Sequence, residues 1–121
     1  MTARARLGAL GEEAAAALLA SKGFSIVARN HRTRLGEVDL VADDGNVLAF
    51  VEVRTRRNDA FGGPAETVGR RKQERVILAA QDFLSRWAGP ERAVRFDVVA
   101  VTDAPGAPRI EHFENAFVPE A

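Results

Sequence analysis

Apolar and polar residues alternate in two neighbouring stretches of the chain, between residues 36 and 56. The stretches are joined by Asp43-Asp44-Gly45-Asn46, and an Asp-Gly pair between alternating segments is typical of a β-hairpin turn. A two-residue turn at Asp44-Gly45 would place Asp43 opposite Asn46. The pattern therefore predicts two antiparallel strands, whose successive side chains point to opposite faces of a sheet.

The two faces of this predicted hairpin differ in character. One is wholly apolar, and it carries Val38, Leu40, Ala42, Val47, Ala49, Val51 and Val53. The other mixes charged and apolar side chains, namely Glu37, Asp39, Val41, Leu48, Phe50, Glu52 and Arg54. A slip of the pairing by two residues keeps both sets intact, whereas a slip by one exchanges them. Three carboxylates and one arginine are therefore expected at one end of the second face.

These carboxylates have two interpretations. Like charges on opposed strand positions destabilise a hairpin by up to about 1 kcal/mol. Either the face is solvated and Arg54 neutralises a neighbour, or the carboxylates bind a hard divalent cation. Val41, Leu48 and Phe50 favour the second interpretation, because they indicate that the face is covered, and covered carboxylates need a partner.

Helices are predicted on either side of the hairpin along the chain. Apolar residues recur at helical spacing over residues 7–22 and again over 64–87. Residues 30–33 are predicted to be a polar connection into the hairpin, and three further apolar segments are predicted to be strands, at residues 24–29, 93–102 and 109–113. The order αβββαββ, with an antiparallel hairpin inside it, predicts a single α/β domain over residues 1–121 with a mixed sheet flanked by helices.

Composition limits the classes of function. The chain has 121 residues, a formal net charge of zero and no cysteine, which excludes disulfides, thiol nucleophiles and thiolate metal sites. The glycine-rich nucleotide motifs and the zinc motifs are also missing from the sequence. The alanine-rich run 14–20 follows Glu12 and Glu13 and is too short for a membrane span. A cytoplasmic location without membrane contact is therefore expected.

Basic residues gather around the predicted hairpin although the net charge is zero. They precede it, follow it and open the second predicted helix. Scattered solvated charge and a rim that binds nucleic-acid phosphates explain this distribution equally well. The residues of such a rim are Arg32, Arg34, Arg56, Arg57, Arg71 and Lys72.

The order of these motifs resembles a known family. Asp39, followed one strand later by Glu52-Val53-Arg54, is similar to the D…(D/E)-x-K signature of the PD-(D/E)XK nuclease superfamily. The wider pattern resembles the uncharacterised bacterial YraN-type family, which is related to Holliday-junction resolvases. The matching segments span nearly the whole chain, and they are Gly8-x-x-Gly11-Glu12, Asn30, residues 36–40 and 50–56, Lys72, residues 95–98 and Ala116-Phe117. The chain departs from the signature at Arg54, where the signature has lysine.

This resemblance implies a restriction-endonuclease-like fold and a Mg²⁺- or Mn²⁺-dependent endonuclease acting on branched or damaged DNA. Asp39, Glu52 and the main-chain carbonyl of Val53 would hold the metal. Glu37 and Glu12 would be auxiliary catalytic carboxylates. Arg54 would take the place of the catalytic lysine, where it can donate hydrogen bonds but cannot act as a general base.

Two other functions remain open on the same residues. One is a nuclease-fold module that binds nucleic acid or a protein partner without turnover, and the lysine-to-arginine departure at Arg54 favours it. The other is a structural subunit that does not interact with nucleic acid. A homodimer is compatible with each of these functions.

Overall fold

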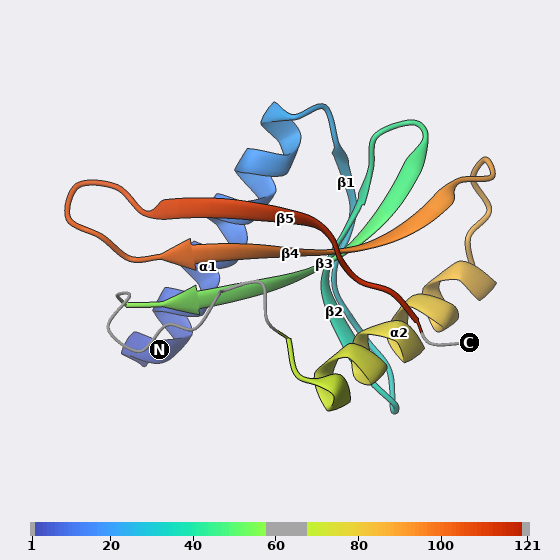
Figure 1. Cartoon of the computed structure of the whole chain (residues 1–121), viewed down its shortest axis with the longest axis horizontal. Helices are drawn as coiled ribbons and strands as arrows, with labels where there is room; N and C mark the ends of the chain where they lie inside the picture. Colours follow the sequence, from blue (N-terminus) through green and yellow to red (C-terminus); the bar gives the residue numbers. More distant parts are fainter. Residues whose placement is uncertain (1, 58–67, 120–121) are drawn as a thin grey trace.

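The structure, a computed structural model, describes residues 2–57 and 68–119. Two helices and five strands follow one another in these residues in the order αβββαββ (Figure 1). They are α1 (Ala3–Ser21), β1 (Ser25–Arg32), β2 (Glu37–Asp43), β3 (Val47–Arg56), α2 (Arg70–Ser85), β4 (Ala93–Thr102) and β5 (Arg109–Phe117). The predicted element order and the α/β class are confirmed.

The five strands form one mixed sheet in the order β1-β2-β3-β4-β5. β3 and β4 are parallel, and the other neighbouring strands are antiparallel. Parallel neighbours need a long crossover connection, and α2 lies in that connection. The strongly apolar β4 is an inner strand, whereas β5 is an edge strand.

The helices pack on two separate apolar clusters, one against each face of the sheet (Figure 1). Leu48 and Phe50 of β3 pack in the cluster that contains α2, and the alternating residues Ala49 and Val51 pack in the cluster that contains α1. Both faces of the hairpin are therefore buried, as the apolar residues on its second face indicated. Val38 is an exception to the predicted faces, because it belongs to the cluster of α2.

β2 and β3 form the predicted hairpin, but the predicted pairing is wrong by two residues. Asp43 faces Leu48 rather than Asn46. The Asp44 amide donates to the Val47 carbonyl at 3.2 Å, and Gly45 has a φ of 98°. The Asp44 carboxylate also accepts the amides of Asn46 and Val47, so it holds a turn centred one residue later than expected. This displacement preserves both faces.

The polar connection predicted at residues 30–33 is wrong for its first three residues. β1 continues to Arg32, and His31 and Arg32 pair with Val38 and Glu37 of β2. β1 is an edge strand and most of its residues are at least partly exposed. Polar side chains are tolerated in such a strand because one side of it faces solvent.

Small residues bring α1 close to the sheet. A Cβ atom on Gly11 would overlap the side chain of Thr55 in β3, so no larger residue fits there without displacement. α1 begins at Ala3, earlier than predicted, while the part of the second predicted helix at residues 64–67 lies outside the described residues. Neither α1 nor α2 has the length and apolar character needed to span a membrane.

Candidate functional site

Asp39 and Glu52 meet at the end of the hairpin that lies away from its turn. The regular pairing of β2 with β3 reaches Leu40 and Val51, and the next position in the same register sets Asp39 beside Glu52. There the Val53 amide donates to Oδ2 of Asp39 at 2.8 Å. The two carboxyl groups are also hydrogen-bonded to each other. The structure therefore brings together the two acidic residues of the predicted signature.

The surroundings of both carboxyl groups disfavour their ionised forms. Glu52 is 4% exposed, and burial together with the nearby charge of Asp39 raises the pKa of Glu52 to about 7. Burial also raises the pKa of Asp39, although the hydrogen bond from the Val53 amide opposes this effect. The two carboxyl groups therefore titrate as a coupled pair, and each makes ionisation of the other less favourable.

Lys72, in the first turn of α2, makes a direct ion pair with this site. Its Nζ lies 3.1 Å from Oε1 of Glu52, and the Lys72 side chain is 52% exposed while that of Glu52 is 5% exposed. The sequence pattern grouped Lys72 with a phosphate-binding rim. It did not indicate this contact, because the contact depends on how α2 packs across β3.

The two auxiliary carboxylates lie in different surroundings. Glu37 accepts a hydrogen bond from Nε of Arg32 at 3.1 Å, and its charge contributes to the raised pKa of Asp39. Glu12 accepts a hydrogen bond from Asn30 at 3.3 Å. Glu37 is thus joined electrostatically to the carboxylate pair, whereas Glu12 is held by Asn30 beside α1.

The donor set suits a hard divalent cation. Asp39, Glu52 and the Val53 carbonyl supply oxygen ligands, and Mg²⁺ is commonly bound by one or two carboxylates together with waters and substrate phosphates. Over residues 2–57 and 68–119, no group of three or more His, Cys, Asp and Glu side chains is arranged to hold a metal. A cation here would therefore depend on two carboxylates, and substrate or water would complete its shell. Arg54 lies two residues beyond Glu52 on the same face of β3 and is exposed.

Arginines line two cavities near the ends of β1 and β3. One, of about 490 Å³, is lined by Arg32, Thr33, Arg34, Leu35, Leu78, Asp82 and Arg86. The other, of about 500 Å³, is lined by Arg4, Leu7, Thr55, Arg56 and Arg57. Four of the predicted rim residues thus occur in two arginine clusters, and the structure adds Arg4 and Arg86 to them. Neither addition was predictable, because Arg4 reaches its cluster from α1 and Arg86 from the residue that follows α2.

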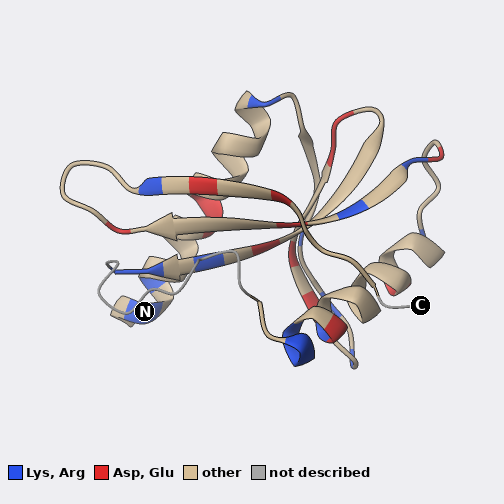
Figure 2. Ribbon diagram, in the orientation of Figure 1, with Lys and Arg blue, Asp and Glu red and all other residues tan. Residues whose placement is uncertain are grey.

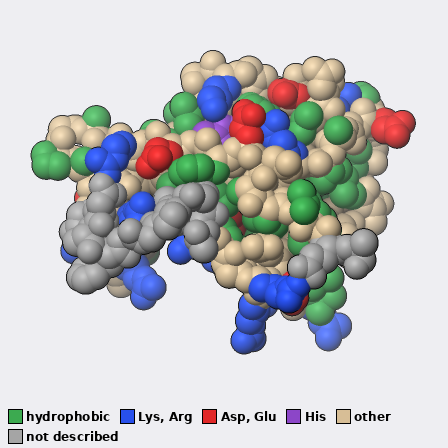
Figure 3. All heavy atoms as spheres, in the orientation of Figure 1, with side chains coloured by type: hydrophobic (Ala, Val, Ile, Leu, Met, Phe, Trp, Pro, Cys, Tyr) green, Lys and Arg blue, Asp and Glu red, His purple; other side chains and the backbone are tan. Residues whose placement is uncertain are grey.

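The remaining rim residues, Arg71 and Lys72, are exposed in the first turn of α2. Basic residues mark this turn and the C-terminal half of β3 in the ribbon (Figure 2). In the space-filling view, Lys and Arg side chains project from the lower edge of the molecule (Figure 3).

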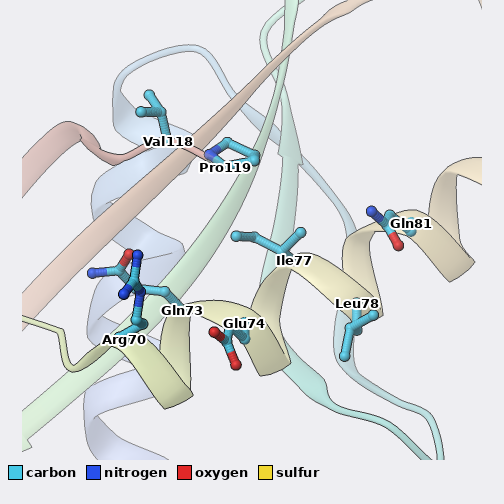
Figure 4. Close-up of a pocket in the computed structure, with 8 residues that line it drawn as sticks. All are labelled: Arg70, Gln73, Glu74, Ile77, Leu78, Gln81, Val118 and Pro119. Carbon is cyan, nitrogen blue, oxygen red and sulfur yellow. The ribbon is translucent and has the colours of Figure 1, made fainter. Parts of the chain in front are cut away.

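A third cavity, of about 410 Å³, lies between α2 and the residues that follow β5 (Figure 4). Its apolar lining comes from Ile77, Leu78, Val118 and Pro119. None of the predicted carboxylates or rim residues lines it, so it is separate from the candidate site.

A second buried carboxylate, Asp97 of β4, is fully satisfied by its neighbours. It accepts two hydrogen bonds from Arg95, at 2.8 and 2.9 Å, one from the Asn115 amide at 2.9 Å, and a contact from Nε2 of His112 at 2.8 Å. Burial alone would raise the pKa of Asp97, but the His112, Arg95 and Asn115 hydrogen bonds outweigh it and hold that pKa below its usual value. The sequence indicated no chemistry for His112, and the structure gives it a role in tying β5 to β4.

Comparison with known proteins places the chain among relatives that carry no assigned activity in their names. The model of the uncharacterised protein family UPF0102 matches residues 11–101. A UPF0102 protein of Anaeromyxobacter dehalogenans (strain 2CP-C) is 60% identical over 114 residues, which cover 94% of this chain and 85% of that protein. A UPF0102 protein of Pelotomaculum thermopropionicum is 50% identical over 117 residues, which cover 95% of this chain and 98% of that protein.

Proposed function

Since this chain belongs to the uncharacterised family UPF0102, we propose its function from the site itself: a Mg²⁺- or Mn²⁺-dependent endonuclease that hydrolyses phosphodiester bonds in branched or damaged DNA. The membership agrees with the YraN-type resemblance of the sequence. The nuclease activity and the DNA substrate are proposals that go beyond it.

One observation carries the proposal. The half-buried Asp39 and the buried Glu52 lie side by side, in a position where their pKa values are raised. Two such carboxyls lower the stability of the fold unless a cation neutralises them. The ion pair with Lys72 offsets only part of this cost, because the pKa of Glu52 remains raised beside it, and a divalent cation bound with substrate would offset the rest.

Each residue of the candidate site would have a distinct role in this function. Asp39, Glu52 and the Val53 carbonyl would hold the cation, which would lower the pKa of a bound water and stabilise charge on the phosphate. Glu37 would adjust the charge on Asp39, and Arg54 would orient water or phosphate through its hydrogen bonds. Glu12, held by Asn30, would act from outside this group. The arginine clusters would bind the DNA backbone, with an affinity that falls steeply as salt rises.

The test is a comparison of wild type with Asp39→Asn. We expect Mn²⁺ to raise the melting temperature of the wild type and to support cleavage of single-stranded, duplex or four-way-junction DNA, because the cation binds the folded form alone. Asp39→Asn should abolish both effects. Asp44→Asn is the matched control: it removes a carboxylate at the turn, where the Asp44 side chain holds two amides that an asparagine oxygen can also accept.

The proposal fails if Mn²⁺ leaves the melting temperature of the wild type unchanged, or if Asp39→Asn keeps the full response. DNA binding that is absent at low salt would also count against it, because the phosphate-binding arginines would then have no role.

A second candidate, a nuclease-fold module with little or no turnover, is favoured by Arg54. Arginine cannot be deprotonated near neutral pH, so it cannot activate water as a general base. If the lack of a general base at position 54 limits cleavage, Arg54→Lys should increase Mn²⁺-dependent cleavage while leaving DNA affinity nearly unchanged. Robust wild-type cleavage that Arg54→Lys reduces would contradict this candidate.

A further inference from the structure

The ion pair between Lys72 and Glu52 joins a flexible, partly exposed side chain to a buried carboxylate. Glu52 is almost completely buried in β3, whereas about half of the Lys72 side chain is exposed. The ammonium thus reaches the carboxylate pair from the solvent side. A lysine has a flexible four-carbon stem, so its charged end can leave such a position without disturbing the helix that carries it.

Lys72 lies in the first turn of α2, a position that is unfavourable for a positively charged side chain. It belongs to the first turn, which has no acidic residue and includes Arg70 and Arg71. The positive end of a helix dipole disfavours cations in this turn. The local helix therefore gives no reason for Lys72, whereas the two neighbouring carboxylates of Asp39 and Glu52 do.

Lys72 and a divalent cation would compete for the same atom. The ammonium lies 3.1 Å from Oε1 of Glu52, and a cation bound by that carboxylate would lie at roughly 2.0–2.6 Å from its oxygen. Two positive charges so close together repel each other. Either the cation or the ammonium occupies the carboxylate pair, and the one displaced needs another negative partner.

We propose that Lys72 stands in for the divalent cation in the metal-free protein, and that it moves to a phosphate of the bound DNA when a cation takes its place. This inference rests on the proposed function, and it names Lys72 as a residue that links metal binding to substrate binding. The other explanation is that Lys72 is a fixed anchor between α2 and β3. The two explanations predict opposite effects of removing the ammonium on the affinity for metal.

The experiment measures Mn²⁺ binding to the full chain by isothermal titration calorimetry. In Lys72→Met the competing charge is gone, and we expect Mn²⁺ to bind about three to ten times more tightly, the equivalent of one partly exposed ion pair. Arg71→Met is the matched control, because it removes the same charge from the adjacent exposed position of the same turn. It should change the affinity for Mn²⁺ less than about twofold.

DNA binding gives the second measurement, with Ca²⁺ in place of Mn²⁺ to prevent cleavage. Lys72→Met should weaken the binding of duplex or four-way-junction DNA more in Ca²⁺ than without a divalent cation, whereas Arg71→Met should weaken it by a similar factor in both conditions. Lys72→Arg should restore the DNA affinity, because it returns a cation that can contact phosphate. A fixed anchor would not produce a difference that depends on Ca²⁺.

The outcomes separate this inference from the proposed function. If wild type binds Mn²⁺ through Asp39 while Lys72→Met binds it equally or less tightly, the inference is overturned and the proposed function stands. If neither wild type nor Lys72→Met binds Mn²⁺, both fall. Circular dichroism of each variant checks that α2 is intact, and a Lys72→Met variant that is folded and binds Mn²⁺ more tightly than Arg71→Met supports the inference.

Discussion

Glu52→Gln should make the metal-free protein more stable at alkaline pH. The substitution replaces a buried acid with a neutral side chain of nearly the same shape. The glutamine amide can donate to the carboxylate of Asp39, as the protonated acid does, and its oxygen can accept from Lys72. The variant therefore removes the negative charge at this position and keeps the contacts around it.

The direction of the effect follows from the raised pKa of Glu52. Burial and the charge of Asp39 raise this pKa from 4.5 to about 7 in the folded protein. Between these values the folded chain holds a proton that the unfolded chain has released. The free energy of unfolding of the wild type therefore falls as the pH rises through this window, whereas the glutamine variant has no such loss.

The size of the effect follows from the width of the window. Each pH unit within it corresponds to about 1.4 kcal/mol of unfolding free energy. Only a small part of the loss has occurred at pH 5, and nearly all of it at pH 8. The variant should therefore gain about 2–3 kcal/mol over the wild type between pH 5 and pH 8.

Urea unfolding in the presence of a chelator measures this gap at each pH, followed by the fluorescence of Trp87, the single tryptophan. Glu74→Gln is the control, because it removes an equal charge from an exposed glutamate of α2. Its stability relative to the wild type should not vary between pH 5 and pH 8. A gap between Glu52→Gln and the wild type that is the same at both pH values would refute the reasoning, because Glu52 would then ionise as an ordinary surface acid does.

Two further predictions concern the parts of the fold that position the site. Gly11→Ala should destabilise the protein by about 1–3 kcal/mol, because the added Cβ would overlap Thr55. Gly8→Ala has open space around the added atom and should stabilise the same helix by about 0.5–1 kcal/mol. Urea unfolding of both variants tests this contrast. Asp97→Asn should cost about 3 kcal/mol at pH 7, since its partly buried partner Arg95 loses a counter-charge. Because the folded pKa of Asp97 lies below its usual value, the stability it provides is lost as the pH falls below about 3.8, and the two proteins should converge in acid.

The alternation of the hairpin was sufficient to predict its faces, with the exception of Val38, although the register was wrong. The turn lies one residue later than predicted, and Asp43 pairs with Leu48. Since side chains repeat every two residues along a strand, a displacement by two leaves Asp39 and Glu52 on the same face. The pairing of these two carboxylates was therefore predictable even though the turn was not.

Edge elements and long-range polar contacts were not predictable in the same way. The polar residues at the end of β1 do not alternate with apolar ones, so the pattern did not predict a strand there. An edge strand can form without this alternation, because main-chain pairing with its neighbour stabilises it. The pair of His31 with Asp82, at 2.8 Å, joins β1 to α2. Local periodicity contains no information about such contacts, since they depend on the packing of one element against another.

The same limit applies to the positively charged side chain beside Glu52. The resemblance to the nuclease signature directs attention along β3, where position 54 has arginine instead of lysine. In the structure an ammonium does reach Glu52, but it comes from Lys72 on α2. A positive charge beside a buried carboxylate has the same electrostatic effect from either element, because Coulomb interactions depend on distance and surroundings and not on sequence order. If Lys72 supplies this charge, arginine at position 54 leaves the carboxylate pair neutralised, and the departure from the signature limits proton transfer without removing the site.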